Sequence, residues 1–233
     1  DTYILESAAY LTVGLADRGE DFNTESAVCK AFGTEVLWSV INEAVQIAGG
    51  IGFSREYPYE RFLRDARVNM IFEGTNEIQR IFISLSSLVV VGSWLKSMDR
   101  ASKNPLKGEG ALASYAEGKL APAFKKPHPA LAEEAALVEE FTDILARKSE
   151  AVMRRYGREI KEREYIQKRL ADMAIDLYCI SAGLSRVTRA IEENGLAAAE
   201  TEVLIVKTFA REAAHRLRRN AAAVDENDDD RRA

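Results

Sequence analysis

One carboxylate in the sequence occupies a position that calls for a chemical explanation. In the stretch MIFEGTNEIQR, residues 70–80, Glu73 follows three apolar residues and precedes a glycine. An unpaired carboxylate is costly to bury, so this side chain is expected to point outward, to be paired, or to be adapted for chemistry. A helix predicted to start after Gly74, with Thr75 or Asn76 as its cap, would add free N–H groups, which suit an anion or a polar ligand.

The residues alone leave two interpretations of Glu73 open. A carboxylic acid in an apolar pocket can become a general base near neutral pH. An acid that helps to neutralise the positive end of a helix is the more common arrangement. Without further information, the second interpretation is favoured.

Two neighbouring segments could contribute to a site with Glu73. QIAGGIGF, residues 46–53, ends a predicted helix in three glycines, which can form a helix C-cap or let the backbone approach a phosphate closely. The C-cap is favoured on spacing. In RFLRDARV, residues 61–68, Arg64 and Asp65 are interpreted as a structural ion pair rather than a catalytic set.

Composition sets the class of protein. The chain has 233 residues, 47% of them apolar, which is enough for a core in one or two domains. Abundant Ala, Leu, Glu, Lys and Arg, without alternating Val, Ile and Thr, predict an all-α fold with almost no sheet. The net charge of −5 argues against nucleic acid as a partner.

The cysteines and histidines do not indicate a metal site. Cys29 and Cys179 lie far apart in helical patterns, so two small buried thiols are favoured over a disulfide or a metal centre. His128 and His215 form no ligand cluster with them. The longest apolar stretch, residues 84–95, is too short and too rich in serine to span a bilayer. Because the chain starts in mid-helix without Met, we expect it to be the C-terminal portion of a larger polypeptide.

Helical periodicity organises the first part of the chain. Apolar residues at helical spacing predict a helix over residues 3–16 and a longer one over about 25–48, with its N-cap in DFNT, residues 21–24. A short helix is expected in the Tyr-Pro segment that follows. The next helix, after Gly74, is expected to bury a stripe made of Ile78, Ile81, Phe82, Leu85, Leu88 and Val89.

The last part of the chain is predicted to be an antiparallel helical bundle over residues 130–223. A helix from about residue 131 to 156 precedes two helices separated by Asn194-Gly195, a helix stop and turn. The apolar stripes of these two helices are Ile166, Leu170, Met173, Leu177, Ile180, Leu184, Val187 and Ile191, and then Ala199, Val203, Val206, Ala210, Ala213 and Leu217. Residues 224–233 are expected to be a disordered, solvated tail.

Residues 98–129, which connect the two parts, are predicted to be a basic linker. They hold four of the five prolines and mix lysines with apolar side chains. Such a segment could lie on an anionic membrane surface, in peripheral contact. A solvated linker packed on its own protein is slightly favoured by composition.

Taken together, QIAGGIGF, YPYERFLRDARV and IFEGTNEIQR resemble, in order and spacing, the C-terminal helical domain of the acyl-CoA dehydrogenases. The resemblance covers residues 1–97. Downstream, KNPLKGEG and QKRLADMAIDLY resemble the extra C-terminal region of the very-long-chain class. The implied architecture is the end of a helical catalytic domain followed by a bundle that replaces a second dimer of the shorter, tetrameric relatives.

The resemblance implies a role for each site residue. Glu73 would remove the α-proton of an acyl-CoA thioester, while the β-hydrogen leaves as hydride to FAD. The developing enolate would be stabilised by the backbone N–H of the same residue. Phe72 and Gly74 would line the substrate. The residues implied to contact FAD are Thr75, Asn76 and Glu77 in one subunit, and Gln46, Gly49 and Gly50 toward the flavin of a neighbouring subunit.

The implied function is oxidation of long or very long chain acyl-CoA to trans-2-enoyl-CoA in fatty acid β-oxidation. The implied partners are an electron-transfer flavoprotein and a second copy of the chain, as a homodimer. The expected location is the cytoplasm of a bacterium, or the mitochondrial matrix at the inner membrane of a eukaryote. Without the upstream domains the fragment is expected to be inactive. The alternative is a non-catalytic helical assembly or scaffold factor derived from the family.

Overall fold

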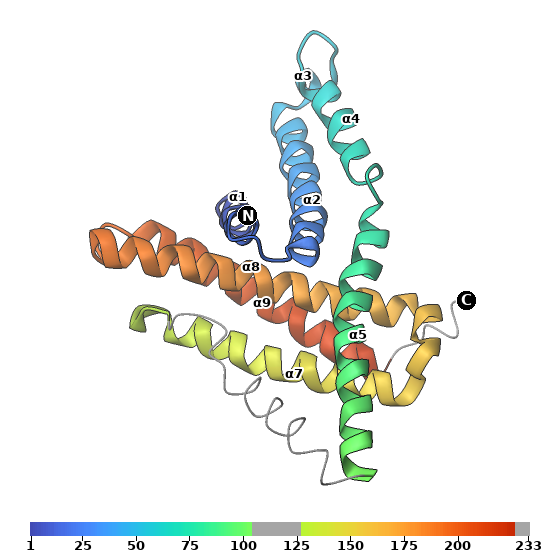
Figure 1. Ribbon diagram of the computed structural model, residues 1–233. Coiled ribbons are helices and arrows are strands. Elements are labelled where there is room, and N and C mark those ends of the chain that lie inside the picture. The colour runs from blue at the N-terminus through green and yellow to red at the C-terminus, as the bar shows by residue number, and fades with distance from the viewer. Residues whose placement is uncertain (104–126, 227–233) are drawn as a thin grey trace.

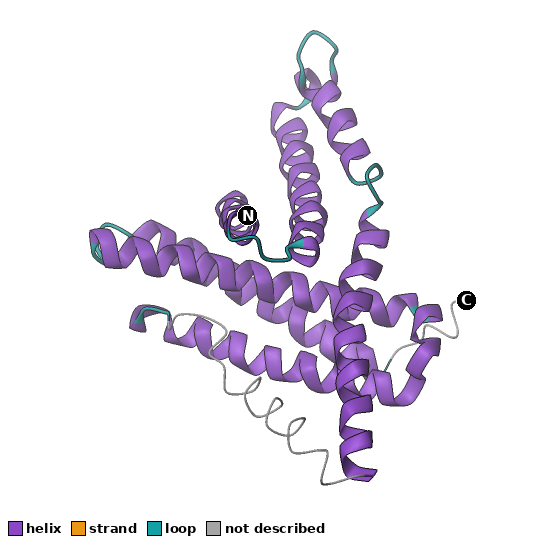
Figure 2. Cartoon of the chain, viewed as in Figure 1, coloured by secondary structure: helices purple, strands orange, loops and turns teal. Residues whose placement is uncertain are grey.

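The computed structural model describes residues 1–103 and 127–226, and every regular element within these two ranges is a helix (Figure 1). The predicted all-α class is therefore confirmed, as Figure 2 shows. The elements are α1 (Thr2–Asp17), α2 (Asn23–Ala48), α3 (Gly50–Phe53), α4 (Tyr59–Asn69), α5 (Asn76–Lys103), η2 (Pro129–Leu131), α7 (Ala132–Tyr156), η3 (Gly157–Glu162), α8 (Glu164–Asn194) and α9 (Glu200–Asp225).

None of the helices in the described ranges is both long enough and apolar enough to cross a membrane.

The helix ends test the capping predictions. Gly195 has φ 85° and terminates α8, which confirms the predicted stop at Asn194-Gly195. The N-cap of α2 is Phe22, within the predicted DFNT segment, but its side chain makes no capping hydrogen bond. Asp21 instead accepts from the backbone N–H and the side-chain amide of Asn23, at 3.1 and 2.6 Å. A turn made by Asp21 therefore starts α2 two residues earlier than expected.

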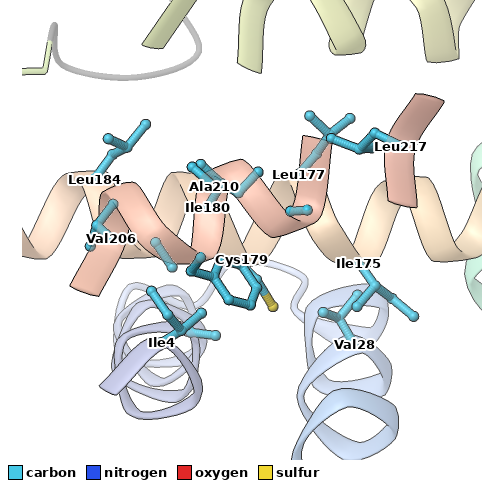
Figure 3. Close-up of a cluster of buried hydrophobic side chains, with 14 of the residues drawn as sticks. Ile4, Val28, Ile175, Leu177, Cys179, Ile180, Leu184, Val206, Ala210 and Leu217 are labelled. Atoms are coloured by element: carbon cyan, nitrogen blue, oxygen red, sulfur yellow. The ribbon is translucent and has the colours of Figure 1, made fainter. Parts of the chain in front are cut away.

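The predicted stripes of α8 and α9 form the centre of the molecule. Every member of both stripes is buried except Val203, which is half-buried against the same core. The two helices run antiparallel, and α7 packs beside them (Figure 1). Figure 3 shows Leu177, Ile180 and Leu184 of α8 near Val206 and Leu217 of α9. Cys179 lies in the same core, and both cysteines are free thiols.

The core also includes helices from the first part of the chain. Ile4 of α1, Val28 of α2 and Ile83 of α5 belong to the same cluster of buried residues as most of the α8 and α9 stripes. Figure 3 shows Ile4 and Val28 against α8, with Ile175 beside Val28. The bundle is therefore packed directly on the helices that precede the linker, and the two parts stabilise each other.

The predicted stripe of α5 is wrong in part. Leu88 is buried, but Ile78, Phe82 and Val89 are exposed, and the buried face instead carries Ile83. Both faces of this helix are apolar, so periodicity alone could not identify the face that packs on α2, α7 and α8.

Two predicted boundaries differ from the structure. Helix α5 continues to Lys103, so the first residues of the proposed 98–129 linker are helical. The central part of that linker, residues 104–126, lies outside the described residues, and so does the prediction of a membrane-surface segment there. At the other end, α9 continues to Asp225, and Val224 is buried with Leu88 and Leu170. Residues 227–233 of the proposed tail also lie outside the described part.

Helices α2 and α4 form a hairpin, joined through α3, that extends away from the bundle (Figure 1). The start of α2 lies near α1, α5 and α8, whereas its far end lies beside α3 and α4 (Figure 1). The connection from α4 back to α5 returns the chain to the side of α2. This connection, residues 70–75, contains Glu73.

Candidate active site

The backbone around Glu73 has an unusual conformation. Glu73 has φ 54° and Gly74 has φ 84°, so two consecutive residues are left-handed. Among the described residues, Glu73 is the one non-glycine residue with a positive φ. For a residue with a Cβ this conformation costs about 1–2 kcal/mol, and it persists only where surrounding contacts fix it. Such strain directs attention to this turn as a functional site.

Contacts from both sides fix the turn. The side chain of Gln79 donates to the carbonyl of Glu73 at 3.0 Å. Lys30, on α2, donates to the carbonyl of Gly74 at 2.7 Å. The hydroxyl of Thr75 accepts from the backbone N–H of Ile78 at 3.3 Å, which confirms the predicted cap of α5.

Asn76 is the buried centre of these contacts, with only 3% of its surface exposed. Its side-chain oxygen accepts from Lys30 at 2.8 Å and from Thr34 at 3.1 Å. Its amide nitrogen lies within hydrogen-bond distance of Glu35 at 3.1 Å and of the carbonyl of Ala31 at 3.3 Å. The side chain of Asn76 is thus turned inward to α2, where it positions the turn.

The Glu73 side chain itself is exposed, so among the three sequence interpretations it points outward in this chain. Gly74 is exposed too, and Ile71 and Phe72 each keep half of their surface open. Within the described ranges, no apolar pocket encloses the carboxylate. The arrangement presents an acid and an apolar flank at the N-terminus of α5, both accessible from outside the chain.

The other predicted residues lie at the far end of α2. Gln46, Gly49 and Gly50 are all exposed. At 1.5 Å per residue, Gln46 lies roughly 24 Å along the helix from Lys30, which touches the Glu73 turn. The structure therefore does not bring the two predicted groups together within one chain. This separation fits contacts with two different ligands, as an arrangement of two subunits would require.

The three glycines at the far end of α2 differ in their structural roles. Gly49 has φ 61° and its N–H bonds back to the carbonyls of Val45 and Gln46, which confirms a C-cap. A Cβ at Gly52 would lie 2.5 Å from the Val45 carbonyl, so this glycine permits close packing of α3 on α2. Gly50 has neither constraint, and a Cβ there would meet nothing within 4 Å. Its open surface leaves room for a group from outside the chain.

The predicted pair of Arg64 and Asp65 is wrong. Arg64 pairs with Glu60, one turn earlier on α4. Residues four apart face each other on a helix, whereas adjacent residues do not. The pair is structural, as expected, but with a different partner.

Sequence reasoning missed the residues that hold the turn, namely Lys30, Gln79, Glu35 and Arg80. Lys30 lies 44 residues before the carbonyl that it contacts. Local patterns do not report such pairs, because they depend on how α2 packs against α5. Gln79 is six residues from Glu73, close enough for a sequence signal, but the contact requires the left-handed turn.

Charged residues line a cleft of about 310 Å³ between α2, α5, α8 and α9, close to this turn. Arg80 pairs with Glu35 and Asp172, and Arg216 pairs with Asp176. Burial raises the pKa of Asp176, although Arg216 opposes the shift. The Arg80–Asp172 pair crosses the junction between the first helices and the bundle, whereas the Arg216–Asp176 pair lies inside the bundle.

Two family models match the chain. The C-terminal domain of acyl-CoA dehydrogenases matches residues 1–88, and the ACAD9/ACADV C-terminal domain matches residues 129–232. The very long-chain specific acyl-CoA dehydrogenase of rat mitochondria is 36% identical over 97% of this chain, which covers 36% of that protein. A probable acyl-CoA dehydrogenase of Bacillus subtilis is 30% identical over 94% of this chain and 39% of its own length.

A solved structure shows the same arrangement. A crystal structure of an acyl-CoA dehydrogenase complexed with FAD, from Bacillus anthracis, aligns with 99% of this chain and 41% of its own. The TM-score is 0.73 and the sequence identity 30%. The chain spans little more than a third of the length of the curated relatives that it matches along most of its own sequence.

The fold and these matches place the chain in one class of protein: an all-α region made of two C-terminal domains of acyl-CoA dehydrogenases. The chain belongs to the acyl-CoA dehydrogenase family, of which it represents the C-terminal portion, and within that family it is of the very-long-chain type. The match to the ACAD9/ACADV C-terminal domain supports this type. Not every relative in the family matches this far along the chain: the probable acyl-CoA dehydrogenase fadE25 of Mycobacterium leprae matches only 34% of it.

Proposed function

We propose that the protein carrying this chain is an FAD-dependent acyl-CoA dehydrogenase that converts long or very long chain acyl-CoA to trans-2-enoyl-CoA. The observation that supports this most directly is the turn at Glu73. Its carboxylate points outward from a backbone that is fixed on both sides. A catalytic base needs such fixed geometry, because small displacements from the reacting proton cost large factors in rate.

In this proposal Glu73 removes the α-proton, and its own backbone N–H stabilises the enolate oxygen that develops. Phe72 and Gly74 contact the substrate, since both are accessible beside the carboxylate. Exclusion of water around the base falls to the rest of the protein, because the described residues leave this face open. Closure by an apolar acyl chain would then make the base more effective near neutral pH.

The accessible residues fit contact with FAD. Thr75 caps α5 and Glu77 lies in its first turn, where N–H groups suit an anionic or polar ligand. Gly50 leaves space that none of the described residues fills, and Gln46 and Gly49 are exposed next to it. We keep Asn76 in the proposed set by its position, while its side chain holds the turn. Bound FAD supplies the acceptor for the β-hydride.

The proposed partners follow from this reaction. The two groups of proposed FAD contacts lie apart along α2, one beside residues 30–35 and the other at and beyond Gln46, so we propose a homodimer in which each subunit completes the other's cofactor site. Reoxidation of the cofactor requires an electron acceptor, for which we propose an electron-transfer flavoprotein. We expect the protein in the cytoplasm of a bacterium, or in the mitochondrial matrix of a eukaryote.

The test uses the full-length protein loaded with FAD and mixed anaerobically with a long-chain acyl-CoA. We expect the visible absorbance of the flavin to bleach, and Glu73→Gln to retain the flavin but abolish the bleaching. A flavin that ignores short, medium and long acyl-CoA would overturn the proposal and favour the non-catalytic scaffold.

A further inference from the structure

A single arginine connects the Glu73 turn to the C-terminal bundle. Arg80 lies on α5, one turn after Asn76, and its side chain is only 13% exposed. It makes two parallel bonds to the carboxylate of Glu35 on α2, at 2.7 and 2.9 Å. Its third nitrogen donates to Asp172 on α8 at 2.6 Å. Glu35 and Arg80 belong to the first matched domain, whereas Asp172 belongs to the second.

The electrostatics favour a rigid junction. Burial alone would lower the pKa of Arg80, but the two carboxylates raise it instead. A charge held by two partners at low exposure is costly to leave half-paired. The second oxygen of Asp172 accepts from Lys168 at 2.7 Å, which fixes the carboxylate on its own helix. Asp172 therefore presents one oxygen to Arg80 in a defined direction.

Hydrogen bonds continue from Arg80 to the turn. Glu35 is bonded by Arg80 and also lies 3.1 Å from the amide nitrogen of Asn76. The oxygen of Asn76 accepts from Lys30, and Lys30 holds the carbonyl of Gly74. The path from the bundle to the residue after Glu73 is thus continuous.

We propose that Asp172 is a positioning residue: the bundle uses it to hold Arg80 and, through Glu35 and Asn76, to keep Glu73 in its left-handed conformation. The extension of the very-long-chain type thereby controls the geometry of the base. The conformational part stands on the contacts above, whereas its consequence for the reaction rests on the proposed function.

The physical reason lies in the strain of the turn. A non-glycine residue at φ 54° relaxes toward common backbone conformations unless its neighbours prevent it. Without the Asp172 carboxylate, Arg80 loses the partner on one side and can turn toward solvent together with Glu35. Asn76 would then lose an acceptor, and its hold on Lys30 would weaken.

The experiment compares Asp172→Asn with Asp176→Asn in the full-length, FAD-loaded protein. Asp176 is a matched control, because it lies one turn further along α8 and pairs with Arg216 inside the bundle. Hydrogen exchange of the backbone amides in residues 70–79 is measured first. We expect Asp172→Asn to accelerate this exchange about tenfold, a size typical of mutations along a coupled network, and Asp176→Asn to leave it unchanged.

The second readout is anaerobic bleaching of the flavin by a long-chain acyl-CoA. We expect Asp172→Asn to lower the maximal bleaching rate about tenfold with little change in half-saturating substrate, and Asp176→Asn to have no such effect. Asp172→Glu retains the charge and should recover part of the rate. If Asp172→Asn does not fold, Asp172→Glu is measured in its place. Its expected effects on hydrogen exchange and on the bleaching rate have the same direction but are smaller.

The outcomes separate this inference from the proposed function. Equal exchange in the Asp172→Asn and Asp176→Asn proteins would overturn the conformational claim. Faster exchange in Asp172→Asn with an unchanged bleaching rate would overturn the claim that Asp172 controls the reaction through Glu73. The dehydrogenase proposal would still stand. If wild-type flavin does not bleach, the proposed function fails, and the exchange comparison still decides whether Asp172 holds the turn.

Discussion

At the scale of single residues, the Glu73 turn depends on the absence of a side chain at the next position. Gly74 has φ 84°, and a Cβ there would lie 2.8 Å from the side-chain nitrogen of Gln79. That nitrogen donates to the Glu73 carbonyl, so any displacement of Gln79 removes a contact that fixes the backbone of Glu73. Gly74 is therefore needed for its backbone conformation and for the space beside it.

Gly74→Ala is expected to destabilise the protein by about 1–2 kcal/mol, because alanine is strained at positive φ. The measurement is the free energy of unfolding from urea denaturation. Gly14→Ala is the matched control. It lies inside α1, where a new Cβ makes only ordinary contact with Arg18 at 3.8 Å. We expect the control to be neutral or stabilising by up to about 1 kcal/mol, and a loss as large as that of Gly74→Ala would contradict this account.

Two thiols, the buried Cys179 and the half-buried Cys29, predict a loss of stability in alkali. Burial raises the pKa of Cys29 and Cys179, and raises that of Tyr178 to about 12. An acid that titrates later in the folded state binds more protons there, so the folded state is favoured less as pH rises. The stability that each raised pKa contributes is fully present below the unfolded-state pKa, which is 9.0 for a thiol. It is lost as pH rises through the folded-state pKa.

The melting temperatures of wild type and Cys179→Ala, measured from about pH 7 to about pH 10, check this prediction. The variant lacks the buried thiol, and we expect its cavity to give it a lower melting temperature than wild type near neutral pH. Above about pH 9 the difference in melting temperature should narrow, because only the wild type loses the stability contributed by the Cys179 thiol. A gap that stays constant across this range would show that Cys179 does not titrate during unfolding.

At the scale of helices, the sequence patterns predicted the elements that depend on local information. The stripes of α8 and α9 and the stop at Gly195 were predictable, because periodicity and a glycine specify them within a few residues. The buried face of α5 was not, because Ile78 and Phe82 are as apolar as the buried Ile83. The choice between the faces depends on α2, α7 and α8, which are distant in sequence.

The same limit applies to the candidate site. Glu73, Gly74 and the cap at Thr75 lie in one short motif, from which the sequence analysis selected them as candidates. Lys30 and Asp172 contribute through packing of separate helices, and Arg80 contacts Asp172 across 92 positions. No local pattern distinguishes these charged residues from solvated ones elsewhere on α2 and α8.

Helix α9 offers a direct test of the core. Leu217 is fully buried between α8 and α9, whereas Leu204 on the same helix is 66% exposed. Leu217→Ala should lower the free energy of unfolding by about 2–5 kcal/mol, because it removes buried methyl groups and leaves a cavity. Leu204→Ala should change it by less than about 0.5 kcal/mol. Similar losses in urea denaturation would contradict the placement of α9.

At the scale of the whole molecule, the hairpin of α2 and α4 leaves apolar residues uncovered far from the bundle. Ile47 is 86% exposed and Phe53 84%, next to Gln46, Gly49 and Gly50. Exposed apolar groups of this size, gathered at one tip, indicate a contact surface. Under the proposed function, that surface joins two subunits and brings the tip of one to the cofactor of the other.

The double variant Ile47→Glu and Phe53→Glu of the full-length protein is therefore expected to dissociate into monomers and to lose FAD at the same time. Two carboxylates at the tip would have to be desolvated for the subunits to pair, and this cost exceeds what the lost apolar contacts supplied. Sedimentation velocity gives the mass, and absorbance gives the flavin content. Leu204→Glu, which also replaces an exposed apolar residue but on α9, should keep both dimer and flavin. Monomers that retain a full complement of FAD would show that each subunit completes its own site, and a persistent dimer would place the interface elsewhere.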